Sequence, residues 1–314
     1  MVRCWGVRGS LPTPLAPETV REKIAAVISR ASSEDMRSME AKERFLASLP
    51  QWLFGTWGGN TACVEVRSGA DILLFDAGSG IRDFATEIMR RPRKQREYHL
   101  FFSHFHWDHI IGLPFFTPLY DPGVRVCLYS PVRRFREYLE VLMSPPFFPV
   151  TMEAMRADKE FIVLEEDVPY RVGRGFVTPI PMTHPGGSYA YRIEKGGKAV
   201  LYATDVELAD EDFLPTPENR RRFSGVDLLI IDSQYTLGEA IEKINWGHSS
   251  FTLVVDFAVR WKIPRVLLFH HEPLYDDKFL FHNCEAAREY AAHQGGDLDI
   301  RLAQEGEIHY VSVE

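Results

Sequence analysis

The sequence lacks several features that would place it in a special class of protein. Its 314 residues include four cysteines, far apart and without a Cys-x-x-Cys pair, which favours free thiols over disulfides. No stretch approaches the ~18 consecutive apolar residues of a membrane-spanning helix. The first residues run directly into a strand-like pattern without the features of a signal peptide, so we expect a cytoplasmic protein that does not bind a membrane.

Basic residues are fewer than acidic ones, with 36 Lys and Arg against 44 Asp and Glu. The formal net charge is −8 at pH 7, which argues against a long nucleic acid as the main partner. Basic runs at 90–96 and 220–222 are local exceptions, which we interpret as solvated loops. Hydrophobic residues make up 45% of the chain, enough for a large core, although the length alone would suggest two domains.

Two kinds of hydrophobic pattern alternate along the chain. Short β-type runs are predicted at 2–7, 62–67, 71–76, 98–103, 124–129, 161–164, 176–182, 189–193, 199–204, 227–232 and 265–269. Helical patterns are predicted at 81–91, 132–143, 249–261 and 284–293. Together they indicate a layered α/β protein, and the residues alone do not decide its topology.

The most informative segment is Ser103-His-Phe-His-Trp-Asp-His-Ile110, which follows an apolar strand. Three imidazoles and a carboxylate at a strand end are costly to bury unless something binds them. His104 and His106 face the same way in an extended backbone, and the following turn can return Asp108 and His109 to the same space. Because one divalent cation rarely takes four ligands so closely spaced, we expect two adjacent metals. A polar surface loop, or core histidines satisfied by carbonyl groups, is the less favoured interpretation.

Three further candidate ligands follow apolar strands elsewhere. His184 directly follows the β-type run at 176–183, Asp205 follows the run at 199–204, and His270 follows the run at 265–269. Each is the first polar group after a buried run, where the ends of strands open into a crevice. Asp205 alone could be a turn residue, but the set of seven predicts a binuclear site.

This pattern resembles that of the metallo-β-lactamase-fold hydrolases, in which His-x-His-x-Asp-His is followed by His, Asp and His in the same order. The resemblance runs from Trp5-Gly-Val-Arg-Gly-Ser-Leu-Pro12 to about Asp277, nearly the whole chain. It implies a four-layer αββα sandwich that forms one domain over residues 1–314. It also implies two divalent ions, with zinc favoured and manganese or iron as alternatives.

The resemblance divides the seven ligands between the two metals. One metal would be held by His104, His106 and His184, the second by Asp108, His109 and His270, and Asp205 would bridge both. His271 is an alternative to His270. We prefer His270 because Pro273 stands three residues after it, as in similar hydrolases.

Two further aspartates at strand ends are expected to support the site. Asp76, in Ile72-Leu-Leu-Phe-Asp-Ala-Gly-Ser-Gly80, matches the family's early Asp-x-Gly motif, in which the carboxylate orients a ligand histidine. A turn-forming role beside Gly78 and Gly80 is compatible with that. For Asp232, at the end of 227–232, we favour a structural or supporting role over ligation.

The segment Trp246-Gly-His-Ser-Ser250 precedes a predicted helix. Ser249 or Ser250 can cap that helix, whose free N–H groups and the His248 imidazole would suit a phosphate. The segment is similar to the motif of tRNase Z and related phosphodiesterases in which the histidine contacts the scissile phosphate. We therefore expect His248 and Ser249 to bind substrate, with His248 holding a phosphate oxygen or protonating the leaving alkoxide. A histidine that only packs on a helix cap is the alternative.

These features predict a phosphodiesterase that acts on a small phosphodiester such as a cyclic nucleotide. In the predicted reaction, a hydroxide between the two metals attacks phosphorus, and Asp108 and Asp205 orient that hydroxide. Asn60 and the Arg8-Gly-Ser10 turn are expected at the cleft rim. tRNA is less favoured as the substrate, because the chain lacks the Gly- and Lys-rich arm with which tRNase Z grips tRNA.

A hydrolase of esters, thioesters or lactones, like glyoxalase II or the lactonases, is an alternative that the sequence leaves open. So is a sensor that binds a phosphate ligand without turnover. Related enzymes are often dimers, and a homodimer is compatible with the sequence.

Residues 15–55 depart from the family pattern, in which the Gly-Ser-x-Pro-Thr-Pro element passes almost directly to Gly-Gly-Asn-Thr. Pro17 suits a helix start. The apolar positions of two helices follow at Val20, Ile24, Val27 and Ile28, and at Met36, Met39 and Leu46. We expect a helical insertion that is a packed decoration or a dimer contact, with a lid over the metal cleft as the alternative.

Overall fold

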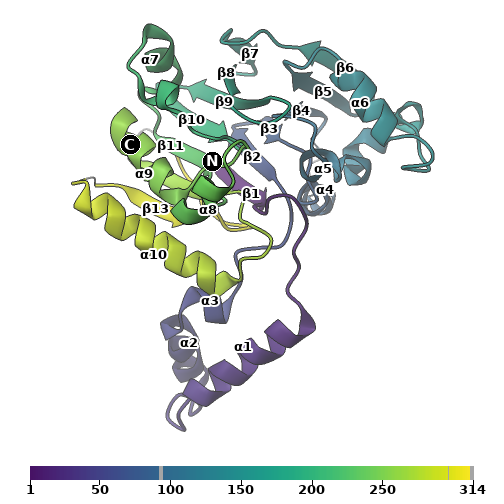
Figure 1. The fold of residues 1–314 in the computed structure, drawn as a ribbon. Coiled ribbons are helices and arrows are strands. Elements are labelled where there is room, and N and C mark those ends of the chain that lie inside the picture. Colours follow the sequence, from purple (N-terminus) through teal and green to yellow (C-terminus); the bar gives the residue numbers. More distant parts are fainter. Residues whose placement is uncertain (92–94, 296, 312–314) are drawn as a thin grey trace.

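The computed structural model describes residues 1–91, 95–295 and 297–311 (Figure 1). Residues 92–94, part of the basic run at 90–96, lie outside the described residues. Within the described ranges, no helix has the length and apolar character needed to cross a membrane.

The strands form two seven-stranded sheets. The first has the order β14-β1-β2-β3-β4-β5-β6 and the second β13-β12-β11-β10-β9-β8-β7. The strands of the first sheet are β1 (Val2–Gly6), β2 (Cys63–Ser68), β3 (Asp71–Phe75), β4 (Glu97–Phe101), β5 (Arg125–Ser130), β6 (Asp158–Val163) and β14 (Ile308–His309). Those of the second are β7 (Tyr170–Val172), β8 (Gly175–Met182), β9 (Ser188–Lys195), β10 (Lys198–Ala203), β11 (Leu228–Asp232), β12 (Arg265–Phe269) and β13 (Asp299–Leu302).

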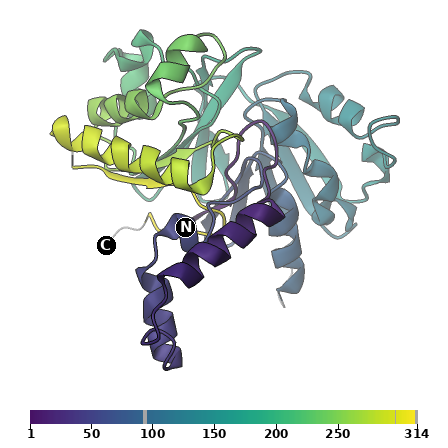
Figure 2. The ribbon, with the colours of Figure 1, turned by 60° about the horizontal axis from the view of Figure 1, so that its bottom comes forward.

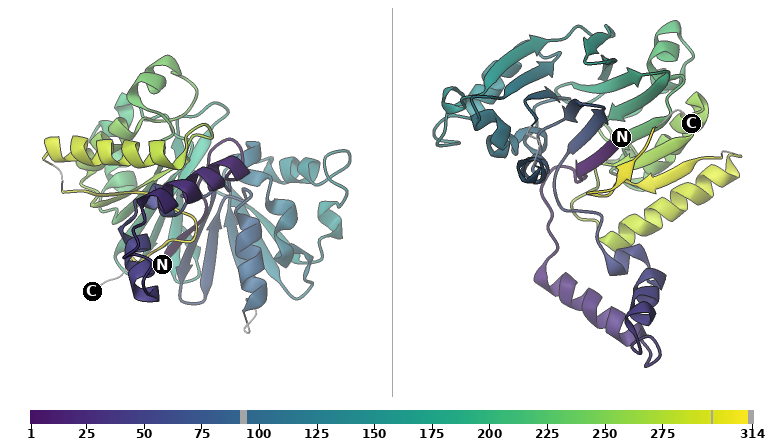
Figure 3. Two further views of the ribbon diagram at one scale, coloured as in Figure 1. Left: turned by 90° about the horizontal axis from the view of Figure 1, so that it is seen from below. Right: turned by 180° about the vertical axis from the view of Figure 1, so that it is seen from behind.

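Helices cover the outer face of each sheet. The helices of the body are α4 (Ile81–Arg90), α5 (Trp107–Ile110), α6 (Phe135–Leu142), α7 (Pro217–Phe223), α8 (Leu237–Glu242), α9 (Phe251–Trp261) and α10 (Asp277–His293). Short 3-10 helices occupy Leu113–Phe115, Thr117–Tyr120, Met152–Ala154 and Asp210–Phe213. Buried side chains of α4 and α6 pack on the first sheet, and those of α9 and α10 pack on the second. The predicted αββα sandwich is therefore confirmed (Figures 1 and 3).

An apolar core lies between the two sheets. Phe75 and Phe101 stack with ring centres 5.1 Å apart, and both contact Tyr191 from the opposite sheet. Strands β3 to β6 are parallel to one another, as are β10 to β13. Because the carboxyl ends of parallel strands meet at one edge of a sheet, the residues after β3, β4, β10, β11 and β12 gather at the same edge of the sandwich.

The strands β7, β13 and β14 were not predicted from the sequence. They contain three, four and two residues, respectively. Runs this short show too little alternation for a period of two to stand out. They lie at or beside the edges of the sheets, and they do not carry predicted site residues.

The insertion projects from the body as a helical arm formed by α1 (Pro17–Arg30), α2 (Met39–Ser48) and α3 (Gln51–Phe54) (Figures 2 and 3). Neither α1 nor α2 contains a buried residue. The predicted apolar stripe of α1 stays exposed, with Ile24 and Ile28 at 56% and 68%. One anchor to the body is Lys23, whose ammonium donates to Asp277 at 2.5 Å at the start of α10. The described helices thus follow the prediction, and the role of the arm stays a prediction.

Candidate metal centre

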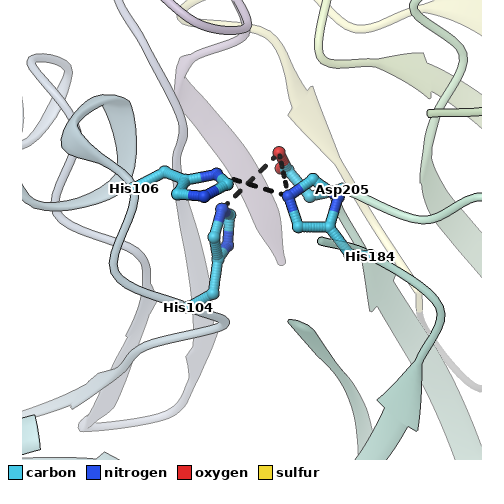
Figure 4. Close-up of side chains that lie close together, drawn as sticks. All are labelled: His104, His106, His184 and Asp205. Atoms are coloured by element: carbon cyan, nitrogen blue, oxygen red, sulfur yellow. Dashed lines mark hydrogen bonds and ion pairs between the residues drawn. The ribbon is translucent and has the colours of Figure 1, made fainter. Parts of the chain in front are cut away.

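The seven predicted ligands lie in two adjoining clusters at the strand-end edge. Candidate ligand atoms within each cluster lie within 4.8 Å of one another. The clusters are His104, His106, His184 and Asp205, and Asp108, His109, Asp205 and His270. Figure 4 shows His104 and His106 on one side of the first cluster, with Asp205 and His184 facing them. The structure therefore brings together from both sheets the residues that the sequence singled out.

Asp205 belongs to both clusters because its two oxygens face different histidines. Oδ1 lies 3.7 Å from His104 Nε2 and 3.9 Å from His184 Nε2. Oδ2 lies 3.0 Å from His109 Nε2 and 3.2 Å from His270 Nε2. This placement suits a carboxylate that bridges two cations.

In four of the histidines, Nδ1 lies within hydrogen-bond distance of a partner outside the clusters, and Nε2 faces the clusters. His109 Nδ1 lies 2.9 Å from Asp76 Oδ2, and His184 Nδ1 lies 2.8 Å from Gly247 O. His270 Nδ1 lies 3.0 Å from Gln234 Oε1, and His104 Nδ1 lies 3.1 Å from Ser103 Oγ. A partner on one ring nitrogen sets the tautomer and orientation of the other, as at metal sites in general.

Two of the facing nitrogens are buried and lack a hydrogen-bond partner. They are Nε2 of His104 and Nε2 of His109, the latter within 3.1 Å of carboxylate oxygens but without hydrogen-bond geometry. Buried polar atoms are nearly always satisfied, so each of these nitrogens is explained by a cation that accepts its lone pair, one cation in each cluster. Imidazole and carboxylate donors fit zinc, manganese or iron. The residues present therefore fit two divalent ions.

The backbone at three of these strand ends is left-handed. Asp76 directly follows β3 with φ +61°, and His270 directly follows β12 with φ +61°. Asp205 lies two residues after β10 with φ +51°. Non-glycine residues adopt this region uncommonly, and such strain concentrates at functional sites. Asp205 and His270 lie within the clusters at these positions, and Asp76 contacts the His109 ring from behind.

The histidines shift the pKa of the carboxylates that they surround. Burial opposes ionisation of Asp205, but His109 and His270 hold the pKa of its carboxyl well below the ordinary value. Burial also opposes ionisation of Asp108, whose pKa is lowered chiefly by His109. Asp108 Oδ2 further accepts a hydrogen bond from Ser10 N at 2.8 Å. Both carboxylates are thus kept in the ionised form that binds cations.

His248 stands beside both clusters and is held by Asp232. Its Nδ1 lies 2.6 Å from Asp232 Oδ2, and its ring centre lies 5.2 Å from that of His270 and 5.4 Å from that of His184. Burial lowers the pKa of His248, but the Asp232 carboxylate outweighs it and raises the pKa to about 9. Asp232 is fully buried, and its other oxygen accepts from Gln234 N, so the geometry agrees with a supporting role.

The side chains of Ser249 and Asn60 are engaged inside the protein. The Ser249 hydroxyl donates to Val206 O and accepts from Leu208 N, while Ser250 caps α9. The Asn60 amide donates to Asp83 and Glu305 and accepts from Ser79. We therefore do not carry these two side chains into the proposed substrate site.

The structure separates His271 from its neighbour. His271 Nε2 donates to Ala303 O at 2.9 Å, and burial lowers its pKa to about 3, while His270 lies in the second cluster.

Asp76 accepts hydrogen bonds from Ser103 N, Ser103 Oγ and Tyr202 OH in addition to its contact with His109. Sequence reasoning missed Gln234 and Tyr202 as supporting residues, because no motif marks a partner that reaches the site from another strand, and it missed Ser103, which directly precedes His104, because a serine at a strand end is common.

Comparison with known proteins places the chain in a family. Residues 72–271, well over half of the chain, match the model of the "Beta-lactamase superfamily domain". Ribonuclease Z of Natronomonas pharaonis is 26% identical over 261 residues, which cover 69% of this chain and 82% of that protein.

Solved structures agree on the fold. The metallo-beta-lactamase fold protein YhfI from Bacillus subtilis superposes with a TM-score of 0.64 at 17% identity, covering 98% of this chain and 96% of that one. A diphosphatase from the PhnP family superposes with a TM-score of 0.62 at 18% identity, covering 98% and 97%. The resemblance to metallo-β-lactamase-fold hydrolases is thereby confirmed, and the chain belongs to the beta-lactamase superfamily.

Proposed function

We propose that this protein is a metal-dependent hydrolase of small phosphodiesters that uses two divalent ions. The observation that carries the proposal is the pair of clusters that share Asp205, with the His248–Asp232 pair beside them. The ribonuclease Z and diphosphatase names of similar proteins support a phosphoester as the substrate. The net charge of −8 favours a small substrate over a long polyanion. The cytoplasmic location expected from the sequence stays a prediction.

In the proposed site, His104, His106 and His184 would hold one ion and Asp108, His109 and His270 the other, with Asp205 between them. Two bound ions would lower the pKa of a water molecule toward neutrality and offset the charge of the phosphate. Zinc is the ion we propose, with manganese or iron as alternatives.

The chain's own residues position the reactants and move protons. Asp108, whose Oδ2 is fixed by Ser10 N and lies between His109 and His270, would orient the attacking water. As the water oxygen bonds to phosphorus, the bond from phosphorus to the leaving oxygen breaks. His248 donates the Nε2 proton to that oxygen, the proton lost by the attacking water passes to solvent, and His248 takes up a proton from solvent for the next cycle. Asp232 keeps Nδ1 of His248 occupied, so that Nε2 is the nitrogen presented to substrate.

The test offers zinc-loaded protein three substrates: bis-p-nitrophenyl phosphate, p-nitrophenyl acetate and a lactone. We expect turnover of the phosphodiester that is lost on chelation and falls at least about 100-fold in His248→Gln. Metal content should stay at two equivalents in that variant, because His248 is not among the proposed ligands. His282→Gln, a histidine of α10, serves as the matched control and should retain full activity.

Turnover of the ester or lactone at the same rate in His248→Gln would instead support a hydrolase of carboxylic esters or lactones and overturn the proposed phosphodiesterase. Tight binding of a phosphodiester to the metal-loaded protein without turnover would identify a sensor. Fewer than two bound equivalents, measured by elemental analysis, would contradict the binuclear site.

A further inference from the structure

A cavity of about 320 Å³ opens beside His248, between α8 and α9. His248 is part of its wall, and the ring of the same residue lies 5.4 Å from that of His184 in the first cluster. The lining on the α8 side comes from Leu237 and Ile241, together with Ile244 just beyond the helix. Leu253 of α9 lies opposite. The cavity therefore adjoins the group to which we assign the proton of the leaving oxygen.

The α8 side of the cavity is apolar and exposed. Leu237, Ile241 and Ile244 are 53%, 63% and 60% exposed, and no residue of α8 is buried. Isolated exposed apolar residues are ordinary, but three of them that line one cavity beside a reactive site suit an apolar ligand.

Apart from His248, the ionisable side chains that line the cavity are two carboxylates and the Tyr290 phenol. Glu207 accepts hydrogen bonds from Asn245 N and Gly247 N, and Asp256 accepts one from Tyr290 OH, so both carboxylates are held in place. No lysine or arginine is found among the described residues that line the cavity. Lys243, which follows α8, has its ammonium 4.1 Å from the centre of the Tyr235 ring and does not line the cavity. Beyond His248, a ligand with a further phosphate would meet two carboxylates and neither lysine nor arginine.

The chemistry of the site says which part of the substrate enters this space. A general acid must lie within hydrogen-bond reach of the oxygen that it protonates. The oxygen that leaves phosphorus must therefore approach His248, and the carbon skeleton attached to it extends along the wall that His248 shares with the cavity.

We infer that the cavity between α8 and α9 binds the leaving group, and that this group is an uncharged, mainly apolar alcohol or phenol. The inference rests on the proposed function. It narrows the substrate class to phosphodiesters with a single phosphate and an apolar leaving group. A nucleotide chain is disfavoured, because its leaving strand carries further phosphates into the acidic cavity.

The test uses two methyl aryl phosphates whose leaving phenols have matched acidity. One phenol carries an alkyl substituent and the other an ionised carboxylate. For the zinc-loaded protein we expect kcat/KM for the alkyl compound to exceed that for the carboxylate compound by at least about tenfold, because an apolar pocket discriminates by that much per small group.

The variant Ile241→Lys places a cation in the cavity and should bring this ratio close to one or below. Ile241→Ala removes apolar area without adding charge and should lower the ratio in the same direction. Met89→Lys in α4 is the matched control, since Met89 is 61% exposed, and should leave the ratio unchanged.

The possible outcomes separate the two proposals. Hydrolysis of both compounds with a ratio near one in the unsubstituted protein overturns the leaving-group inference and leaves phosphodiester hydrolysis standing. An unchanged ratio in Ile241→Lys also overturns the inference. Failure to hydrolyse either compound, with two metals bound, overturns the proposed function, and the assignment of the cavity falls with it.

Discussion

Asp76→Asn removes the charge at the centre of the network behind the second cluster. The carboxylate is fully buried and is contacted by four donors, three of them at Oδ2. An asparagine can keep its amide oxygen toward those three, but its NH₂ group then faces Ser103 N–H. The substitution does not strain the backbone further, because asparagine tolerates the left-handed region at φ +61°.

One buried N–H left without an acceptor costs about 1–3 kcal/mol, and the loss of charge weakens three remaining bonds. We therefore expect the free energy of unfolding of the metal-free protein to fall by about 3–5 kcal/mol in Asp76→Asn. His109 also loses the carboxylate that holds its Nδ1, which should weaken metal binding at the second site about 10- to 100-fold. The first site, whose histidines do not contact Asp76, should change less.

Urea unfolding of chelator-treated protein measures the stability, and competition with a chromophoric chelator measures the affinity of each site. Asp167→Asn is the matched control: Asp167 also has a positive φ, of +60°, but lies at the surface paired with Arg222. Its cost should stay below about 1 kcal/mol. A loss below 1 kcal/mol in Asp76→Asn, or equal weakening at both metal sites, would refute the role given to this carboxylate.

Three further predictions concern other parts of the molecule. His270→Gln should lose one equivalent of metal, whereas His271→Gln should keep both and lose only stability; equal metal contents in elemental analysis would contradict the assignment. Asp277→Ala removes a buried carboxylate that accepts from Lys23 and Trp57 N and should lower the free energy of unfolding by about 3–5 kcal/mol in a denaturant titration. Lys23→Met should lower it less. All four cysteines are buried, and burial raises the pKa of Cys4 to about 12. Ellman's reagent at pH 8 should therefore label no thiol in the native protein and four after denaturation, and rapid native labelling would refute this.

The residues that gather in the two clusters could be singled out from the sequence because their signal is local. His184, Asp205 and His270 each stand where an apolar run ends, and a strand followed by a polar residue can be recognised without a partner. The residues behind them give no such signal. Tyr202 reaches Asp76 across 126 positions of sequence, and Gln234 reaches His270 across 36. Such pairs depend on strand order and register, which hydrophobic periodicity does not contain.

The same limit applies to the predicted substrate contacts Ser249 and Asn60, which stay predictions. Gly-His-Ser-Ser marked a helix start, but the pattern could not tell which serine would cap it, and Ser250 does so while Ser249 supports the neighbouring loop. The Gly-Gly-Asn-Thr turn was expected at the rim, yet Asn60 is occupied by Asp83 and Glu305, the latter 245 positions away. The cavity beside His248 was not anticipated, because it forms where two helices separated by a loop come to lie side by side.

The left-handed conformation at Asp76, Asp205 and His270 bears on how this site could be redesigned. His106 and Asp108, with φ in ordinary regions, accept replacement by other ligands with few demands on the backbone. At the three strand ends, a branched or bulky replacement would be unfavourable for two reasons. It would lose the contacts of the native side chain, and it would strain the backbone torsion angle φ. An engineer who wishes to change the metal preference should therefore vary the residues around α5 and keep asparagine, aspartate, histidine or glycine at the strand ends. At each of the three strand ends, a residue that does not tolerate the left-handed region should lower the free energy of unfolding by about 1–3 kcal/mol.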